Sequence, residues 1–131
     1  MEMYVLLDTS TAVCRVWLVD SNGEQHEYTW QADRQMAKGL LAYIIECLAR
    51  HQVAIQEVAG WGVLRGPGSF TGLRIGIATI NTIGDTCHAP IVGVTGDNWQ
   101  VRALQRLQAG ESDKIILPEY GREARITAPR K

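Results

Sequence analysis

The chain has 131 residues, of which 46% are hydrophobic, and its 13 Lys and Arg residues are balanced by 14 Asp and Glu residues. This length fits one domain of about 100–150 residues, and the hydrophobic share excludes a disordered chain. A net charge of −1 excludes a strongly basic nucleic-acid binder. Because the three cysteines include no C-x-x-C pair, a zinc ribbon and a thioredoxin-like site are also excluded.

The start of the chain and its hydrophobic runs bear on localisation. Residues 1–4 lack the basic segment with which a secretory signal begins. No apolar run approaches the roughly 20 residues that span a bilayer. We therefore expect a cytoplasmic protein without a membrane partner, in which the thiols serve as small hydrophobic side chains.

The first part of the chain has the pattern of a three-stranded antiparallel meander. Tyr4–Leu7 is a short apolar run that predicts a buried strand, and residues 13–19 and 25–30 predict the next two strands. Asn22-Gly23 lies between the second and third strands. This pair favours a tight hairpin turn, because both residue types tolerate positive φ.

From residue 34 onward, apolar residues recur at helical spacing. The pattern predicts a helix over 34–50, a strand at about 58–64, a helix over 71–86, a strand at 90–94, a helix over 97–109 and a last short strand at 115–117. This order matches the RNase H-like half of the actin-like ATPase fold, a single α/β lobe with a mixed sheet and helices on both faces. We expect the first two helices to cover the two faces. The predicted units are this lobe at residues 1–110 and a tail at residues 111–131.

The most informative motif is Gly66-Pro67-Gly68-Ser69-Phe70-Thr71-Gly72-Leu73-Arg74-Ile75-Gly76, which joins a predicted strand to a predicted helix. Glycines and a proline permit a sharp turn and a close backbone approach, and Ser69 or Thr71 can cap the helix. Backbone N–H groups at such a helix end can hold an anion, but a tight turn without a ligand has the same pattern. A Walker A loop is excluded because Leu73-Arg74 stands where Lys-Ser or Lys-Thr is required, and a dinucleotide loop is excluded because position 71 is threonine.

This motif closely resembles that of the TsaB (YeaZ) family, the small subunit of the bacterial tRNA threonylcarbamoyladenosine machinery. Leu7-Asp8-Thr9-Ser10 resembles the family's first strand, residues 89–94 resemble a later strand, and residues 117–122 resemble its terminal segment. The resemblance covers roughly residues 3–94. The chain is accordingly identified as a shortened member of the family that lacks most of the second domain.

The resemblance implies a non-catalytic subunit that activates the TsaD transferase in modifying the adenosine next to the anticodon. It also implies a TsaE-type ATPase in the larger complex and an indirect role for tRNA. No cofactor of its own is expected, and ATP or ADP at the junction with TsaD is left open. His26, His51 and His88 lie on different predicted elements, so we expect no metal site, and we assign no catalytic residue. The alternatives are a degenerate actin-like nucleotide-binding protein and a homodimeric interaction module without a role in tRNA modification.

Two helices supply the predicted partner surface. The helix at 34–50 has a second apolar stripe beside its core stripe, and Gly72 and Gly76 permit close approach of another helix. The predicted interface, which would also form a homodimer in the absence of TsaD, comprises Met36, Leu40, Tyr43, Cys47, Gly72, Arg74, Gly76 and Thr79. Candidate nucleotide or phosphate contacts are Asp8, Ser10, Gly66, Gly68 and Ser69, and candidate tRNA contacts are Arg122, Arg125, Arg130 and Lys131.

Overall fold

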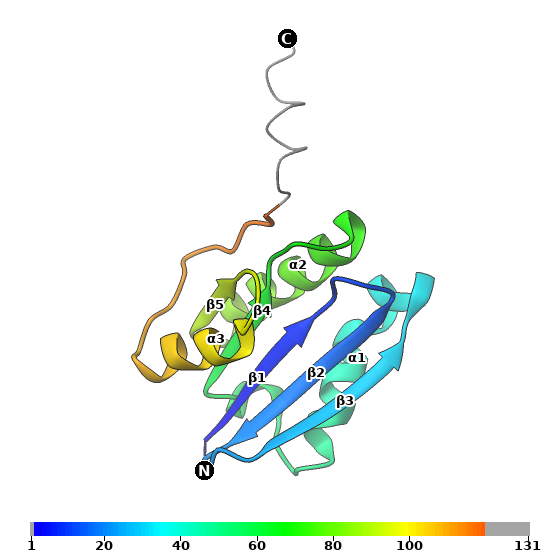
Figure 1. The fold of residues 1–131 in the computed structure, drawn as a ribbon. Coiled ribbons are helices and arrows are strands. Elements are labelled where there is room, and N and C mark those ends of the chain that lie inside the picture. Colours follow the sequence, from blue (N-terminus) through cyan, green and yellow to red (C-terminus); the bar gives the residue numbers. More distant parts are fainter. Residues whose placement is uncertain (1, 120–131) are drawn as a thin grey trace.

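A five-stranded mixed sheet organises the chain, and the computed structural model describes residues 2–119 of it. The strands are β1 (Met3–Asp8), β2 (Val13–Asp20), β3 (Gln25–Gln31), β4 (Gly60–Leu64) and β5 (Ile91–Val94), and they lie in the order β3-β2-β1-β4-β5 (Figure 1). The first three strands form the predicted antiparallel meander, and β4 and β5 add in parallel to β1. The central strands are apolar on both faces, because helices cover both faces.

The turn between β2 and β3 lies at the predicted Asn22-Gly23 pair. Gly23 has φ +82°, whereas Asn22 does not adopt positive φ. The Asp20 carboxylate accepts the backbone N–H groups of Asn22 and Glu24 at 2.9 and 3.0 Å. Because this side chain satisfies the donors of the turn, one glycine with positive φ is enough to reverse the chain.

The helices are α1 (Met36–Ala49), α2 (Phe70–Cys87) and α3 (Trp99–Gln108), with short 3-10 turns at Asp33–Gln35 and Ile55–Glu57. The expectation that the first two helices cover opposite faces is wrong. Both α1 and α2 lie on one face, and α3 covers the other (Figure 1). The connections β3-α1-β4 and β4-α2-β5 step in the same direction along the sheet, and right-handed crossovers of that kind place their helices on the same face.

Each face of the sheet has its own hydrophobic core. The larger core lies under α1 and α2 and includes Val5, Leu7, Leu40, Ile44, Trp61, Leu73 and Ile80. The smaller core lies under α3, where the ring of Trp99 packs edge-on against Trp17 with centroids 5.6 Å apart. Within residues 2–119, none of the helices combines the length and apolar character that crossing a membrane requires.

The edge of β5 is covered by residues 111–119, here named the strap. The short strand predicted at 115–117 is wrong, because the strap bonds to this edge through two side chains and one backbone N–H and no strand forms there. Ser112 Oγ accepts the N–H of Ile91 at 3.1 Å, and the Asp113 carboxylate accepts the N–H of Gly93 at 2.9 Å. In return, the N–H of Asp113 donates to the carbonyl of Ile91 at 2.6 Å. The polar groups that a further strand would use are therefore already bonded.

The middle of the strap is anchored in the larger core. Ile116 is only 3% exposed, and Asn81 of α2 clamps its backbone on both sides. The Asn81 amide donates to the carbonyl of Ile116 at 3.0 Å, and its oxygen accepts the N–H of Ile116 at 2.9 Å. The predicted boundary at residue 110 therefore does not separate the strap from the packing of the lobe.

Acid is expected to weaken the strap through Asp113. Burial alone would raise the pKa of Asp113, but hydrogen bonds from Arg106 and the N–H of Gly93 bring it below its ordinary value of 3.8. The pKa of Asp113 is lower in the folded state than in the unfolded state. Its contacts therefore stabilise the fold at neutral pH, and this stabilisation is lost as the pH falls through 3.8 and below. We expect Asp113→Asn to lower the free energy of unfolding at pH 7 by about 1 kcal/mol, since the ion pair is partly exposed.

Urea unfolding at several pH values measures this effect. The Asp113→Asn chain should lose less stability than the parent between about pH 5 and pH 3, because its side chain no longer titrates. Glu111→Gln is the matched control, because Glu111 bonds the same Arg106 but is 53% exposed. Parallel pH profiles of the parent and the Asp113→Asn chain would contradict the assignment.

Candidate functional site

The glycine motif at residues 66–76 forms a tight joint between α2 and the turn after β1. Ser69 caps α2 by accepting the N–H of Gly72 at 3.3 Å. Thr9, which is fully buried, donates its hydroxyl to the carbonyl of Gly72 at 2.7 Å. A Cβ atom at Gly72 would collide with the Thr9 carbonyl, and one at Gly76 would collide with the Thr9 side chain. The space beside these two glycines is therefore filled by Thr9 of the same chain, and not by a partner helix as predicted.

The five candidate phosphate contacts are engaged with one another or with the strap. Asp8 accepts both the N–H and the hydroxyl of Ser10, at 2.8 and 2.6 Å. The N–H of Ser69 donates to the carbonyl of Ser10, and Gly68 lies against the same residue. Gly66 lies against the backbone of Glu119 in the strap. The loop is packed closely on its neighbours, and a nucleotide contact here stays a prediction.

The prediction of the partner surface requires a correction at most of its positions. Five of its eight residues are buried inside the chain: Met36, Leu40, Cys47, Gly72 and Gly76. Tyr43 is half-buried against the ring of Trp30, with centroids 5.1 Å apart. Only Arg74 is exposed, and Thr79 is half-buried. The side of α1 that is buried within the chain therefore includes much of the apolar stripe that we predicted to face the partner.

The outward side of the two helices presents other apolar side chains. Leu41 and Ile45 of α1 are 46% and 45% exposed. Leu41 also lines a shallow cavity of about 240 Å³ between the helices, together with Ala78, Thr79, Thr82 and Ile83. Among the residues that the structure describes, no charged one lines this cavity. We name the surface formed by Leu41, Ile45, Ala78, Thr79 and Thr82 the α1–α2 face.

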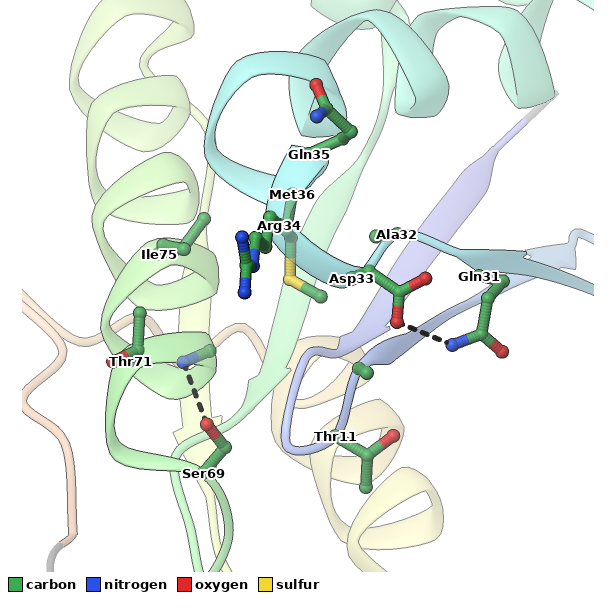
Figure 2. Close-up of a pocket in the computed structure, with 12 residues that line it drawn as sticks. Thr11, Gln31, Ala32, Asp33, Arg34, Gln35, Met36, Ser69, Thr71 and Ile75 are labelled. Atoms are coloured by element: carbon green, nitrogen blue, oxygen red, sulfur yellow. Dashed lines mark hydrogen bonds between the residues drawn. The ribbon is translucent and has the colours of Figure 1, made fainter.

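A larger cavity of about 630 Å³ lies at the N-terminal end of the same two helices. It is lined by Thr11, Ala12, Gln31, Ala32, Asp33, Arg34, Gln35, Met36, Ser69, Thr71, Gly72 and Ile75. In Figure 2 the guanidinium of Arg34 points toward α2, whereas the carboxylate of Asp33 turns away and accepts a hydrogen bond from Gln31 at 2.9 Å. Of the five candidate phosphate contacts, Ser69 alone lines this cavity. Sequence reasoning did not find Arg34, because the residues around it come from separate loops.

Two histidines that are far apart in the sequence, His26 and His51, lie together. The ring of His26 in β3 lies 4.6 Å from that of His51, between centroids, and His51 is bonded to the Tyr28 hydroxyl at 2.8 Å. His26 also approaches the carboxylates of Asp20 and Glu24, at 3.6 and 4.0 Å. Because the Asp20 carboxylate also accepts two backbone N–H groups of the turn, this cluster has a structural role in holding the hairpin.

The cysteines serve as hydrophobic side chains in this structure. Cys14 and Cys47 are both buried in the larger core, and Cys87 is half-buried against it. Burial, reinforced by the neighbouring Cys47, raises the pKa of the Cys14 thiol to about 12. Cys14 is therefore a neutral thiol at physiological pH and a poor nucleophile. The four candidate tRNA contacts, Arg122, Arg125, Arg130 and Lys131, lie outside the described residues.

Comparison with known proteins places the chain in a family. Residues 30–112 match the family model described as TsaD: tRNA N6-adenosine threonylcarbamoyltransferase. The Haemophilus influenzae tRNA threonylcarbamoyladenosine biosynthesis protein TsaB is 31% identical over 106 residues, which are 81% of this chain and 44% of that protein. YeaZ from Pseudomonas aeruginosa superposes with a TM-score of 0.66 at 32% identity, over 72% of this chain and 44% of its own.

A more distant structure bears on the fold alone. The RuvC of T. thermophilus, solved with a Holliday junction substrate, matches 72% of this chain and 65% of its own with a TM-score of 0.52 and 9% identity. YeaZ and RuvC together confirm the predicted RNase H-like architecture. This chain spans less than half the length of the TsaB and YeaZ relatives. Because the family model covers more than half of the chain and these relatives share its sequence and fold, the chain belongs to the TsaB (YeaZ) family.

Proposed function

We propose that this chain acts in tRNA threonylcarbamoyladenosine biosynthesis as a non-catalytic subunit that docks its α1–α2 face on a TsaD-type transferase. The observation that carries the proposal is the exposure of Leu41 and Ile45 beside an uncharged cavity between the helices. Apolar side chains grouped in this way favour association with another protein. The TsaB relative is named for this biosynthetic route, which supports the choice of partner.

The family match supports helix-on-helix pairing. The segment matched by the transferase family model, residues 30–112, contains both α1 and α2. A TsaD-type subunit therefore has an equivalent segment, and two related subunits can pair equivalent surfaces about an approximate two-fold axis. Such pairing lays the two outward helices of each subunit against those of the other, which can supply the roughly 1,000 Å² that a stable interface needs.

A supporting rather than a catalytic role agrees with the candidate site. Asp8 and Ser10 bond to each other, and the loop at 66–69 packs on Ser10 and the strap, so these groups support α2. Within residues 2–119 the buried thiols are neutral at physiological pH, which disfavours nucleophilic catalysis by them. The purified chain alone is accordingly expected to leave tRNA unmodified.

Co-purification and titration with the TsaD protein of the same organism test the docking face. We expect Leu41→Asp and Ile45→Asp each to weaken binding by roughly 100-fold, because the new carboxylate would be buried in the interface. Both positions are exposed, so the variants should remain folded. Val101→Asp is the matched control, because Val101 is 54% exposed on α3, on the opposite face. Unchanged binding of TsaD by both α1 variants would refute this docking face.

A further inference from the structure

We infer that the partner docked on the α1–α2 face presents carboxylate groups to Arg34, Lys38 and Arg74. These three cations border the N-terminal end of that face, and the inference rests on the proposed function. It adds that the partner must be acidic where it meets these cations, and that the partner lies across the helices with its acidic end at their N-terminal end.

The first line of evidence is how the cations of the chain are paired. Within residues 2–119, most cations away from this end of the helices contact an acid, as in Arg15–Glu27 at 3.6 Å, Arg50–Glu46 at 3.7 Å and Arg106–Asp113 at 2.6 Å. Arg102 instead donates to backbone carbonyls.

The cations at the N-terminal end of the helices differ from these. No ion pair with a described residue involves Arg34, Lys38 or Arg74. The guanidinium of Arg74 stacks on the Phe70 ring, with its central carbon 4.9 Å from the ring centroid. Besides these three, the described cations without an ion pair are Arg102 and Lys114.

The second line of evidence is the position of nearby acids. Asp33 is adjacent to Arg34, but its carboxylate accepts a hydrogen bond from Gln31 and turns away from α2 (Figure 2). Glu46 lies further along α1 and is paired with Arg50. Asp85 lies toward the C-terminal end of α2, where it lines a cavity with residues of the strap. The α1–α2 face is therefore positive at its N-terminal end and apolar in the middle.

The third line of evidence is the position of Arg34 close to the α1–α2 face along both helices. Arg34 lines the 630 Å³ cavity together with Met36 of α1 and Ile75 of α2. The smaller cavity, which Leu41 and Thr79 line, lies about one turn further along both helices. A partner helix that lies between α1 and α2 over both cavities would bring a side chain to Arg34, and a carboxylate is the group that offsets the cost of covering a guanidinium.

Charge also decides how the partner lies between α1 and α2. An uncharged groove between two helices accepts a partner helix in either direction with similar apolar contact. Three cations at one end favour the direction that brings the partner's acids to them, and they accelerate the encounter at low salt. RNA would supply phosphates instead, but the exposed Leu41 and Ile45 in the middle of the face favour a protein.

The test is the affinity for TsaD measured at about 50 mM and 500 mM NaCl. We expect Arg34→Glu and Lys38→Glu each to weaken binding about tenfold at low salt and to reduce the salt dependence seen with the parent chain. Lys114→Glu is the matched control, because it reverses an unpaired, exposed cation far from the helices' N-terminal end and should leave the affinity unchanged.

The outcomes separate this inference from the proposed function. If Leu41→Asp abolishes binding while Arg34→Glu and Lys38→Glu leave both the affinity and its salt dependence unchanged, the inference is wrong and the docking face stands. If the charge reversals weaken binding of tRNA to the isolated chain but not binding of TsaD, the cations bind phosphates and the inference is also overturned. If neither Leu41→Asp nor Ile45→Asp affects TsaD binding, the docking face itself is in error.

Discussion

A Gly72→Ala chain is expected to unfold far more readily than the parent, with a loss of about 3 kcal/mol in the free energy of unfolding. In an unconstrained helix the same substitution would stabilise by about 1 kcal/mol, because alanine has the higher helix propensity. The sign reverses here because the added methyl group meets the carbonyl oxygen of Thr9, a backbone atom of a fully buried residue. Either α2 or the turn after β1 must shift to make room.

The neighbouring glycine supplies a matched comparison. Gly76→Ala would collide with the side chain of Thr9, not with its backbone. Removing that side chain in Thr9→Ala should therefore rescue Gly76→Ala in part and leave Gly72→Ala unrescued. Thermal or urea unfolding of the single and double variants measures both couplings. A Gly72→Ala chain as stable as the parent would show that the joint between Thr9 and α2 is not tightly packed.

Local patterns predicted the strands and helices as far as α3, but they added a strand at 115–117 that does not form, and they did not predict how the elements are placed in space. The alternation before residue 31 and the helical spacing after it predicted the order of strands and helices, and the motif at 66–76 is the strand-to-helix turn that its glycines indicated. The faces on which α1 and α2 pack depend on the direction in which the crossover connections step along the sheet. This direction is known only once the strand order is known. Strand order is a non-local property, and the pattern within one element does not contain it.

The candidate site shows the same limit more clearly. Helix α1 is apolar around much of its circumference, so periodicity could not decide between the stripe with Cys47 and the stripe with Leu41 and Ile45. The small residues Gly72 and Gly76 correctly predicted a close approach. They could not identify the approaching group, because Thr9 is more than sixty residues away in the chain.

The strap provides the second large expected effect. Ile116→Ala should lower the free energy of unfolding by about 2–3 kcal/mol, because Ile116 is 3% exposed in the larger core and the strap can relax only in part around the missing atoms. Its neighbour Ile115 is 63% exposed, so Ile115→Ala should stay within about 0.5 kcal/mol of the parent. Two adjacent isoleucines thus give a matched pair that differs in burial alone.

Hydrogen exchange at the edge of β5 reveals whether the strap acts as a unit. The amides of Ile91 and Gly93 donate to Ser112 and Asp113, so loosening Ile116 should speed exchange at both, while amides within β2 keep their protection. Asn81→Ala should have a similar but smaller effect, since it removes the two hydrogen bonds to the Ile116 backbone but leaves the Ile116 side chain buried.

The stabilities and the exchange rates together decide the role of the strap. Equal stability of the Ile115→Ala and Ile116→Ala chains would mean that the strap lies on the edge of β5 without stabilising it. Faster exchange at Ile91 and Gly93 in the Ile116→Ala chain would instead show that one buried side chain keeps this edge closed to a further strand.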